Sequence, residues 1–280
     1  MITENGLYPE LSDAYQSSRG KQTPTQALTQ SGIKVLLNET PFDFRNPSPR
    51  KSDEMDFGSI VHALALGKGA KFAVAPYDDY RTKDARAWRD ETIADGLIPI
   101  KQAKMDEAES IAGIVRAKLH RLFDGRPYET EVPFYWKEGD TWCGGLADAW
   151  CEDMLMIADP KITMRLGMQA RSQMINMGWD IQGAWTLRGF NAIFPQYAGR
   201  IRFANILVKP LPPFTSRVVA LNEAWRHNAE RECERALRIF QTCMATGIWP
   251  SYPDDIEMLD EPAWATNARM MAGIMEEMEQ

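Results

Sequence analysis

The sequence predicts an α/β fold in which a central mixed β-sheet is flanked by helices, with helical additions at both ends. Two observations lead to this prediction. The middle of the chain changes from a helical period of hydrophobic residues to strand-like alternation, and helical patterns stand on both sides of it. The 280 residues, 44% hydrophobic and 25% charged, are enough to enclose a core of this size.

The first half of the chain is expected to be mainly helical. Residues 1–24 are polar with little periodicity, so we expect an irregular arm, followed by a single domain over 25–280. The proline-containing segment 40–54 is expected to be a loop. Hydrophobic periodicity and capping residues predict four helices: 30–38, 52–66, 83–95 and 101–123.

The second half is expected to supply the sheet. Runs of alternating or apolar residues between turn signals predict five strands: 131–138, 142–150, 154–161, 201–209 and 215–221. Helical periodicity predicts four further helices: 164–177, 180–194, 222–246 and 262–280. Strands that alternate with helices in this way favour one mixed sheet with helices on both faces.

Composition argues against several classes of protein. No apolar run approaches 18 residues, and the N-terminus is acidic and polar, so we expect neither a membrane span nor a secretory signal. The four cysteines form no C-x-x-C pair and are expected to be free thiols in a reducing cytoplasm. A net charge of −7 argues weakly against nucleic acid, unless a local basic surface overrides it.

The segment 145-GLADAWCEDMLMIADPKIT-163 places charges among residues that otherwise look buried. A hairpin turning near residues 152–154 would bring Asp148 opposite, or nearly opposite, Asp159, and Lys161 would share a face with Asp159. Two close carboxylates repel unless a cation lies between them, and hard oxygen ligands suit Mg²⁺ or Mn²⁺. A neighbouring lysine can orient or help deprotonate a water and stabilise charge on a phosphate. The alternative is an edge hairpin whose charges face water.

Two more segments extend this pattern. His62 lies in 58-GSIVH-62 on a predicted helix, and Gln182 lies on a helix after the hairpin. Either could have an ordinary role, the histidine within the core and the glutamine as a solvated amide. Their order with the hairpin, Gly-x-x-x-His, Asp, Asp-x-Lys and then Gln, resembles PD-(D/E)XK nucleases of the RecB-like branch. More closely, it resembles the exonuclease VIII (RecE-like) nuclease domains of phages and prophages.

The resemblance covers most of the chain, from about residue 29 to 265, and includes a closing Trp-Pro-x-Tyr-Pro segment followed by Pro-Ala-Trp. It implies a restriction-endonuclease-like core. It also implies an activity, the Mg²⁺-dependent degradation of one strand of linear double-stranded DNA from 5′ to 3′. A single-strand annealing protein would take the remaining 3′ strand, and a ring-shaped homo-oligomer would enclose the duplex.

The resemblance also implies a role for each matching residue. Asp148 and Asp159 match the two acidic metal ligands, His62 the histidine that completes the metal site, and Lys161 the catalytic lysine. Gln182 matches a glutamine at the rim of the active site. Some relatives hold an iron–sulfur cluster, but the four cysteines lack the required spacing, so we expect no cluster.

Pro160 departs from the family pattern, which has an aliphatic residue there. Proline has no N–H, but it keeps the carbonyl that this position offers to the metal in the family, so we expect Pro160 to be a metal ligand through that carbonyl. Two alternatives stay open beside the exonuclease. One is a structure-specific or single-strand endonuclease of the same fold, and the other is a catalytically weakened DNA-binding or assembly protein.

Basic residues near the first helices and after the hairpin are candidates for contact with DNA phosphates. Ser31 and Arg45 are candidates for binding a terminal 5′ phosphate, and Arg165 for contacting the backbone. For Lys34, as for the other basic residues, a solvated surface position is the alternative to phosphate contact.

Overall fold

The computed structural model describes residues 1–18, 20–48, 53–262, 266–267 and 269–271. The chain forms two compact units, Met1–Trp249 and Pro250–Gln280. The sequence predicts an arm over residues 1–24 and a single domain over 25–280. All the strands and helices named below belong to the first unit.

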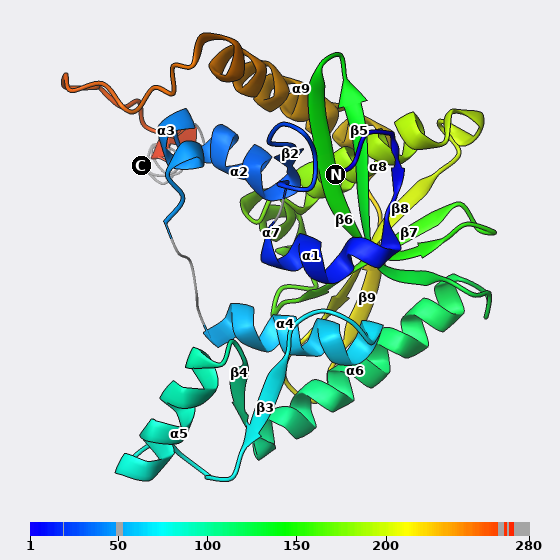
Figure 1. Cartoon of the computed structure of the whole chain (residues 1–280), viewed down its shortest axis with the longest axis vertical. Helices are drawn as coiled ribbons and strands as arrows, with labels where there is room; N and C mark the ends of the chain where they lie inside the picture. Colours follow the sequence, from blue (N-terminus) through cyan, green and yellow to red (C-terminus); the bar gives the residue numbers. More distant parts are fainter. Residues whose placement is uncertain (19, 49–52, 263–265, 268, 272–280) are drawn as a thin grey trace, which may run out of the picture. The chain divides into compact units, whose positions relative to one another are not determined.

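A seven-stranded sheet forms the centre of the first unit, with the strands in the order β1-β5-β6-β7-β8-β9 and β2 paired with β6 (Figure 1). It is mixed, because β2 runs parallel to β6 and β7 parallel to β8, whereas the other pairs are antiparallel. The strands are β1 Gly6–Leu7, β2 Leu28–Thr29, β5 Glu129–Glu138, β6 Thr141–Cys151, β7 Met156–Ile162, β8 Arg202–Val208 and β9 Ser216–Val219. A central mixed sheet with flanking helices confirms the predicted fold class.

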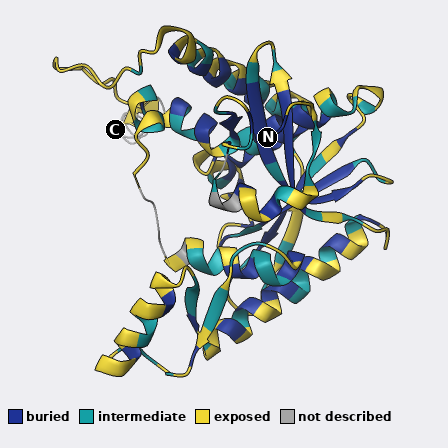
Figure 2. Cartoon of the chain, viewed as in Figure 1, coloured by how far each residue is buried: buried dark blue, intermediate teal, exposed yellow. Residues whose placement is uncertain are grey.

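Helices cover both faces of this sheet. They are α1 Ser12–Ser17, α2 Gln30–Asn38, α3 Pro41–Arg45, α4 Asp53–Leu66, α5 Lys83–Ala94, α6 Gln102–Leu122, α7 Ala170–Asn176, α8 Trp179–Ile193 and α9 Glu223–Thr246, with 3₁₀ turns at Pro9–Leu11 and Pro195–Tyr197. One core joins the sheet to α2, α8 and α9, and a second joins its other face to α4 and α6. Figure 2 shows the strands as mostly buried and the outer faces of α6 and α9 as exposed.

The aromatic residues of the first core explain why α8 is fixed against the sheet. Trp185 is fully buried and its ring lies 4.7 Å from that of Trp136 on β5. Its indole N–H donates to the carbonyl of Gly144 on β6, so the one polar atom of the ring is satisfied. Each buried aromatic side chain of this size contributes about 1.5–3 kcal/mol. The middle of α8 is therefore packed against β5 and β6.

The sequence predicts an irregular N-terminal arm, but in the structure this segment is part of the fold. Its strand β1 extends the sheet along β5, and Tyr15 of α1 packs with Ile2 against Tyr135 and Trp142. Local periodicity does not reveal a two-residue strand and a single helical turn that depend on contacts with β5 and β6.

Several other segments differ from the sequence prediction. Within the expected loop, Thr40 and Asp43 form a capping box that begins α3, and Pro41 at the first helical position favours the helix. The parallel pair β3 Phe72–Ala75 and β4 Ile98–Lys101 was not predicted. Of the helix expected over 164–177, only α7 forms. The helix expected over 262–280 lies largely outside the described residues.

None of the helices in the described ranges has the length and apolar character needed to cross a bilayer.

Candidate active site where two strands diverge

The predicted site lies where β6 and β7 separate. Their pairing ends at Ala149 and Ala158, and β7 then continues beside β8 as far as Ile162. The next residues beyond this last pair are Asp148 and Asp159, so the register places them opposite each other, in agreement with the hairpin predicted from the sequence. From this point β6 and β7 are no longer paired, so the two carboxylates lie where the two strands part.

The backbone of β5 is distorted at the same level. Glu131 has φ of 51°, in the left-handed region that non-glycine residues rarely adopt and that costs about 1–3 kcal/mol. The pairs on either side place Glu131 opposite Asp148 in the register. In β6, Ala147 belongs to one core and Ala149 to the other, so the two-residue alternation of the strand is broken at Asp148. These distortions bring the carboxylates of Glu131 and Asp148 to one side of the diverging strands.

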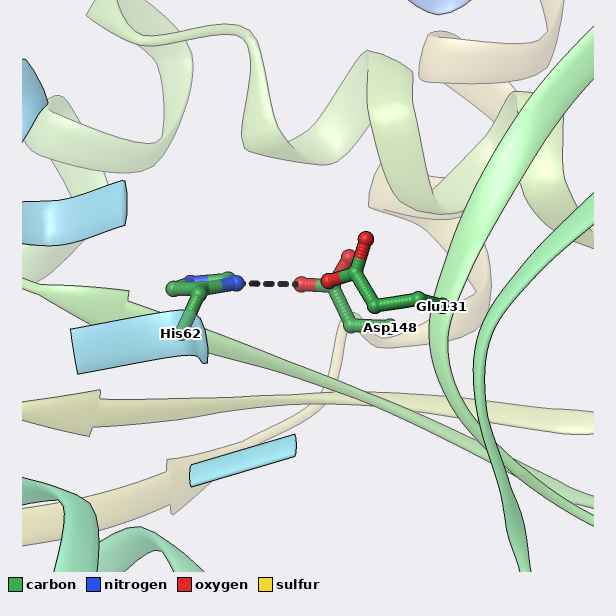
Figure 3. A group of neighbouring side chains, drawn as sticks. All are labelled: His62, Glu131 and Asp148. Carbon is green, nitrogen blue, oxygen red and sulfur yellow. Dashed lines mark ion pairs between the residues drawn. The ribbon is translucent and has the colours of Figure 1, made fainter. Parts of the chain in front are cut away.

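His62, Glu131 and Asp148 form a group whose candidate ligand atoms all lie within 4.8 Å of one another (Figure 3). His62 projects from α4 towards the two carboxylates, and its Nδ1 lies 3.5 Å from Asp148 Oδ2. Glu131 and Asp148 are both buried, with 3% and 8% of their surface exposed. Glu131 was not predicted as a site residue. The signal that could have identified it is an acidic residue in the otherwise apolar run 131-EVPFYW-136.

Asp159 and Lys161 form an ion pair on β7. Being two residues apart in a strand, they project from the same face, and Lys161 Nζ lies 2.5 Å from Asp159 Oδ1. The Lys161 side chain is only 15% exposed, and that of Asp159 only 2%. In a buried pair of this kind, each charge compensates the other.

The contact between His62 and Pro160 fixes how the histidine is oriented. His62 Nε2 lies 2.8 Å from the carbonyl oxygen of Pro160, which can only accept, so Nε2 carries the proton and donates. Burial, followed by the charge of Lys161, lowers the pKa of His62, so the ring is neutral near neutral pH. Nδ1 therefore directs a lone pair at Asp148, an arrangement that is repulsive unless a metal cation or the proton of Asp148 lies between them.

The same contact shows why proline is tolerated at position 160. The N–H and C=O of one strand residue point to the same side, and the carbonyl of Pro160 points to His62 on α4. The missing N–H would face that same side, so its absence breaks no bond of the sheet. The carbonyl keeps a second lone pair, which leaves it able to bind a metal while it accepts from His62. Its role as a metal ligand stays a prediction.

The pKa shifts reflect crowding of negative charge. Burial and the neighbouring carboxylate of Asp159 raise the pKa of Asp148 well above its usual range. Burial alone would lower the pKa of Lys161, but the charges of Asp159 and Asp148 outweigh it and raise that pKa. Lys161 is accordingly an ammonium at neutral pH.

The donor set fits a divalent cation. The buried carboxylates of Asp148 and Asp159 lie beside the ammonium of Lys161, and Glu131 and the imidazole of His62 lie next to Asp148. Within the described ranges, Asp148 Oδ2 and both oxygens of Asp159 accept no well-directed hydrogen bond, although Lys161 Nζ is close. Buried oxygens without donors are costly, and hard oxygen ligands together with one imidazole suit Mg²⁺ or Mn²⁺.

Asn205 is a further polar residue at this site that the sequence did not indicate. It is paired with Asp159 across the parallel strands β7 and β8 and is only 2% exposed. Its amide Nδ2 has no hydrogen-bond acceptor among the residues that the structure describes. Paired residues of adjacent strands project to the same face, so this amide is an available donor beside the Asp159 carboxylate.

The other predicted site residues make no contact with the carboxylates, His62 or Lys161 in the described part of the structure. Gln182 lies on α8 and is half-buried, with its backbone carbonyl bonded to Thr186. Ser31 is exposed on α2, and Arg165 is exposed after β7. Arg45 is exposed at the end of α3, 3.5 Å from Gln26 Oε1 and over the ring of Trp249. Their proposed roles in DNA binding, and that of Gln182 at the rim, stay predictions.

No protein-family model and no curated protein sequence matches this chain. A solved structure from Eubacterium rectale, described as a candidate exonuclease, matches with a TM-score of 0.55 and 14% identity, over 90% of this chain and 92% of that one. A phage-related exonuclease from Haemophilus somnus 129PT matches with a TM-score of 0.32 and 10% identity, over 79% of this chain and 96% of that one. The first likeness shows a shared fold.

The position of His62 leads to a first prediction. His62→Ala should weaken the binding of Mn²⁺ by about tenfold or more, since it removes the only imidazole of the described metal-binding group. Calorimetric titration with Mn²⁺ measures this change, and His227→Ala, an exposed histidine of α9, is the matched control. Unchanged affinity with a lowered melting temperature in EDTA would mean that His62 is a packing residue that joins α4 to β7.

Proposed function

We propose that this protein is a divalent-metal-dependent nuclease that acts on DNA. The observation that carries the proposal is the group of buried carboxylates at the point where β6 and β7 diverge, with the ammonium of Lys161 beside them. The fold shared with a structure described as a candidate exonuclease supports it. So does the order of His62, Asp148, Asp159 and Lys161 along the chain.

The chain supplies the ligands of the metal site from separate elements. Asp148 on β6 and Asp159 on β7 would hold the cation between them, with Glu131 and the Nδ1 atom of His62 to one side. Mg²⁺ bound there would lower the pKa of a water and polarise a phosphate oxygen. The carbonyl of Pro160 keeps the imidazole of His62 in the orientation that directs its lone pair at Asp148.

Lys161 acts in this proposal as a cation and not as a base. Its raised pKa keeps it protonated, so it donates hydrogen bonds and opposes the negative charge that develops on the attacked phosphate. Asp159 holds the ammonium in place through the 2.5 Å ion pair. The proton of the attacking water must therefore go to another acceptor or to solvent.

The finer proposal is an exodeoxyribonuclease that degrades one strand of linear double-stranded DNA from its 5′ end. It would leave a 3′ strand for an annealing protein in phage-type recombination. A closed homo-oligomer would retain the duplex between cuts. These features are supported by the resemblance of the motifs to RecE-like nucleases, and Ser31, Arg45 and Arg165 are the proposed phosphate contacts.

A comparison of linear with closed circular duplex DNA tests the proposal. With Mg²⁺, we expect linear DNA to be degraded from its ends, a 5′ label to be released early, and closed circles to remain intact. Cutting of closed circles would indicate an endonuclease of the same fold. The absence of turnover on any DNA, with either Mg²⁺ or Mn²⁺, would favour the catalytically weakened DNA-binding protein.

A further inference from the structure

Lys34 on α2 lies across the start of α8, close to the candidate site. A Cβ atom added to Gly178 would lie 3.1 Å from Lys34 Cε and 3.3 Å from its Cδ. Gly178 is the residue that precedes α8 and has φ of 59°, so it both permits the turn and makes room for the lysine stem. The lysine stem therefore packs against the backbone turn that precedes α8.

The ammonium of Lys34 has no partner in the described part of the chain. The hydrogen bond that Lys34 makes to a side chain uses its backbone carbonyl, which accepts from Asn38. Burial, and after it the charge of Lys161, lowers the pKa of Lys34 to about 8, with Asp159 and Asp180 acting in the opposite direction. The charges that act on Lys34 are thus those of Lys161 and Asp159 in the candidate site and of Asp180 in the first turn of α8.

Both nearby carboxylates are engaged elsewhere. Asp180 accepts from the backbone N–H of Ile181 and from the indole N–H of Trp225, at 2.9 and 3.0 Å. Asp159 is paired with Lys161. Lys34 is therefore a second ammonium beside the same site, without an anion of its own. Lys34 is half-buried, and a partly desolvated ammonium without an anion of its own favours the binding of an anion from outside the chain.

We propose that Lys34 binds a phosphate of the DNA strand held at the candidate site, its ammonium donating to a non-bridging phosphate oxygen. The inference rests on the proposed nuclease function, since it takes the ligand to be a phosphodiester. Lys34 on α2 would then be a second cation of that site, in addition to Lys161 on β7. Lysine binds phosphate as a point charge and needs no fixed donor geometry, which suits a side chain with a flexible end.

The test measures the binding of a short blunt-ended duplex at several salt concentrations, with Ca²⁺ in place of Mg²⁺ to slow hydrolysis. Each phosphate contact contributes about 0.9 to the slope of log affinity against log salt concentration. Lys34→Met keeps the length of the side chain and removes its charge, so it should lower this slope by about 0.9. Lys34→Arg should preserve the slope. Lys71→Met, at an exposed lysine before β3, is the control and should leave the slope unchanged.

Melting in EDTA without DNA separates a binding role from a structural one. Lys34→Met should melt at or above the temperature of the wild type, because it removes an unpaired charge. An unchanged salt slope, or a clear fall in melting temperature, would overturn the role of Lys34. A wild type that binds DNA with this Lys34-dependent slope, but never cuts it, would overturn the nuclease and leave the phosphate contact supported. A wild type that does not bind DNA would overturn both.

Discussion

Asp148→Asn is expected to reduce metal-dependent hydrolysis of DNA by orders of magnitude while leaving the fold intact. An amide lacks the negative charge that holds the cation against Asp159 and supplies a poorer ligand at the point where β6 and β7 diverge. The measurement is the steady-state rate of release of nucleotides from linear duplex DNA with Mg²⁺. Asp153→Asn, in the exposed turn of the same hairpin, is the control and should keep full activity.

The same variant has a predicted effect on stability that depends on pH. The pKa of Asp148 is raised in the folded protein, chiefly by burial and then by Asp159, so the folded state holds the proton more tightly than the unfolded state. Without metal, stability should therefore fall as pH rises from the usual pKa of an aspartate through the raised one. Asp148→Asn lacks this loss, so in EDTA at neutral pH it should melt above the wild type. A lower melting temperature would mean that the carboxylate stabilises the fold.

Lys161→Met is the second variant for which we expect a loss of activity by orders of magnitude. The change removes the ammonium that opposes charge on the attacked phosphate, and methionine fills a similar volume. Binding of Mn²⁺ should persist, because the carboxylates and His62 remain. The paired measurements are the hydrolysis rate and a Mn²⁺ titration of the same preparation. Loss of metal binding together with activity would show that Lys161 organises the site instead of acting in the reaction.

Stability has to be controlled in this experiment. Removal of one partner of a buried ion pair typically costs about 3–5 kcal/mol, because it leaves the other group without its partner. Rates should be compared below the melting temperature of the variant. Full activity of folded Lys161→Met would contradict the role given to the lysine.

The sequence was sufficient to predict strands β5 to β9 of the sheet and the acidic hairpin, because both depend on local patterns. The strands from β5 to β9 have alternating or apolar runs between turn residues, and the hairpin register follows from the position of its turn. The parallel pair β3–β4 was missed because its strands are only four residues long and joined through a helix. The strand β1 was missed because its two residues form a strand only by pairing with β5.

The site was partly predictable for the same reason. The ordered motif singled out His62, Asp148, Asp159 and Lys161, and the structure brings them together from α4, β6 and β7. Glu131 was not singled out, because its place in the site depends on a distortion of β5 that no residue pattern indicates. Asn205 likewise depends on the pairing of β7 with β8, which are separated by two helices in the sequence.

The most direct test of the metal site is a crystal structure of the protein with millimolar Mn²⁺, with the ion located by its anomalous scattering. We predict a peak at about 2.1 Å from carboxylate oxygens of both Asp148 and Asp159, with the carbonyl oxygen of Pro160 also in the coordination sphere. No peak between Asp148 and Asp159 at that concentration would contradict the metal centre and with it the proposed nuclease. A peak bound only by His62, Glu131 and Asp148 would contradict the assignment of Asp159 and Pro160 as ligands.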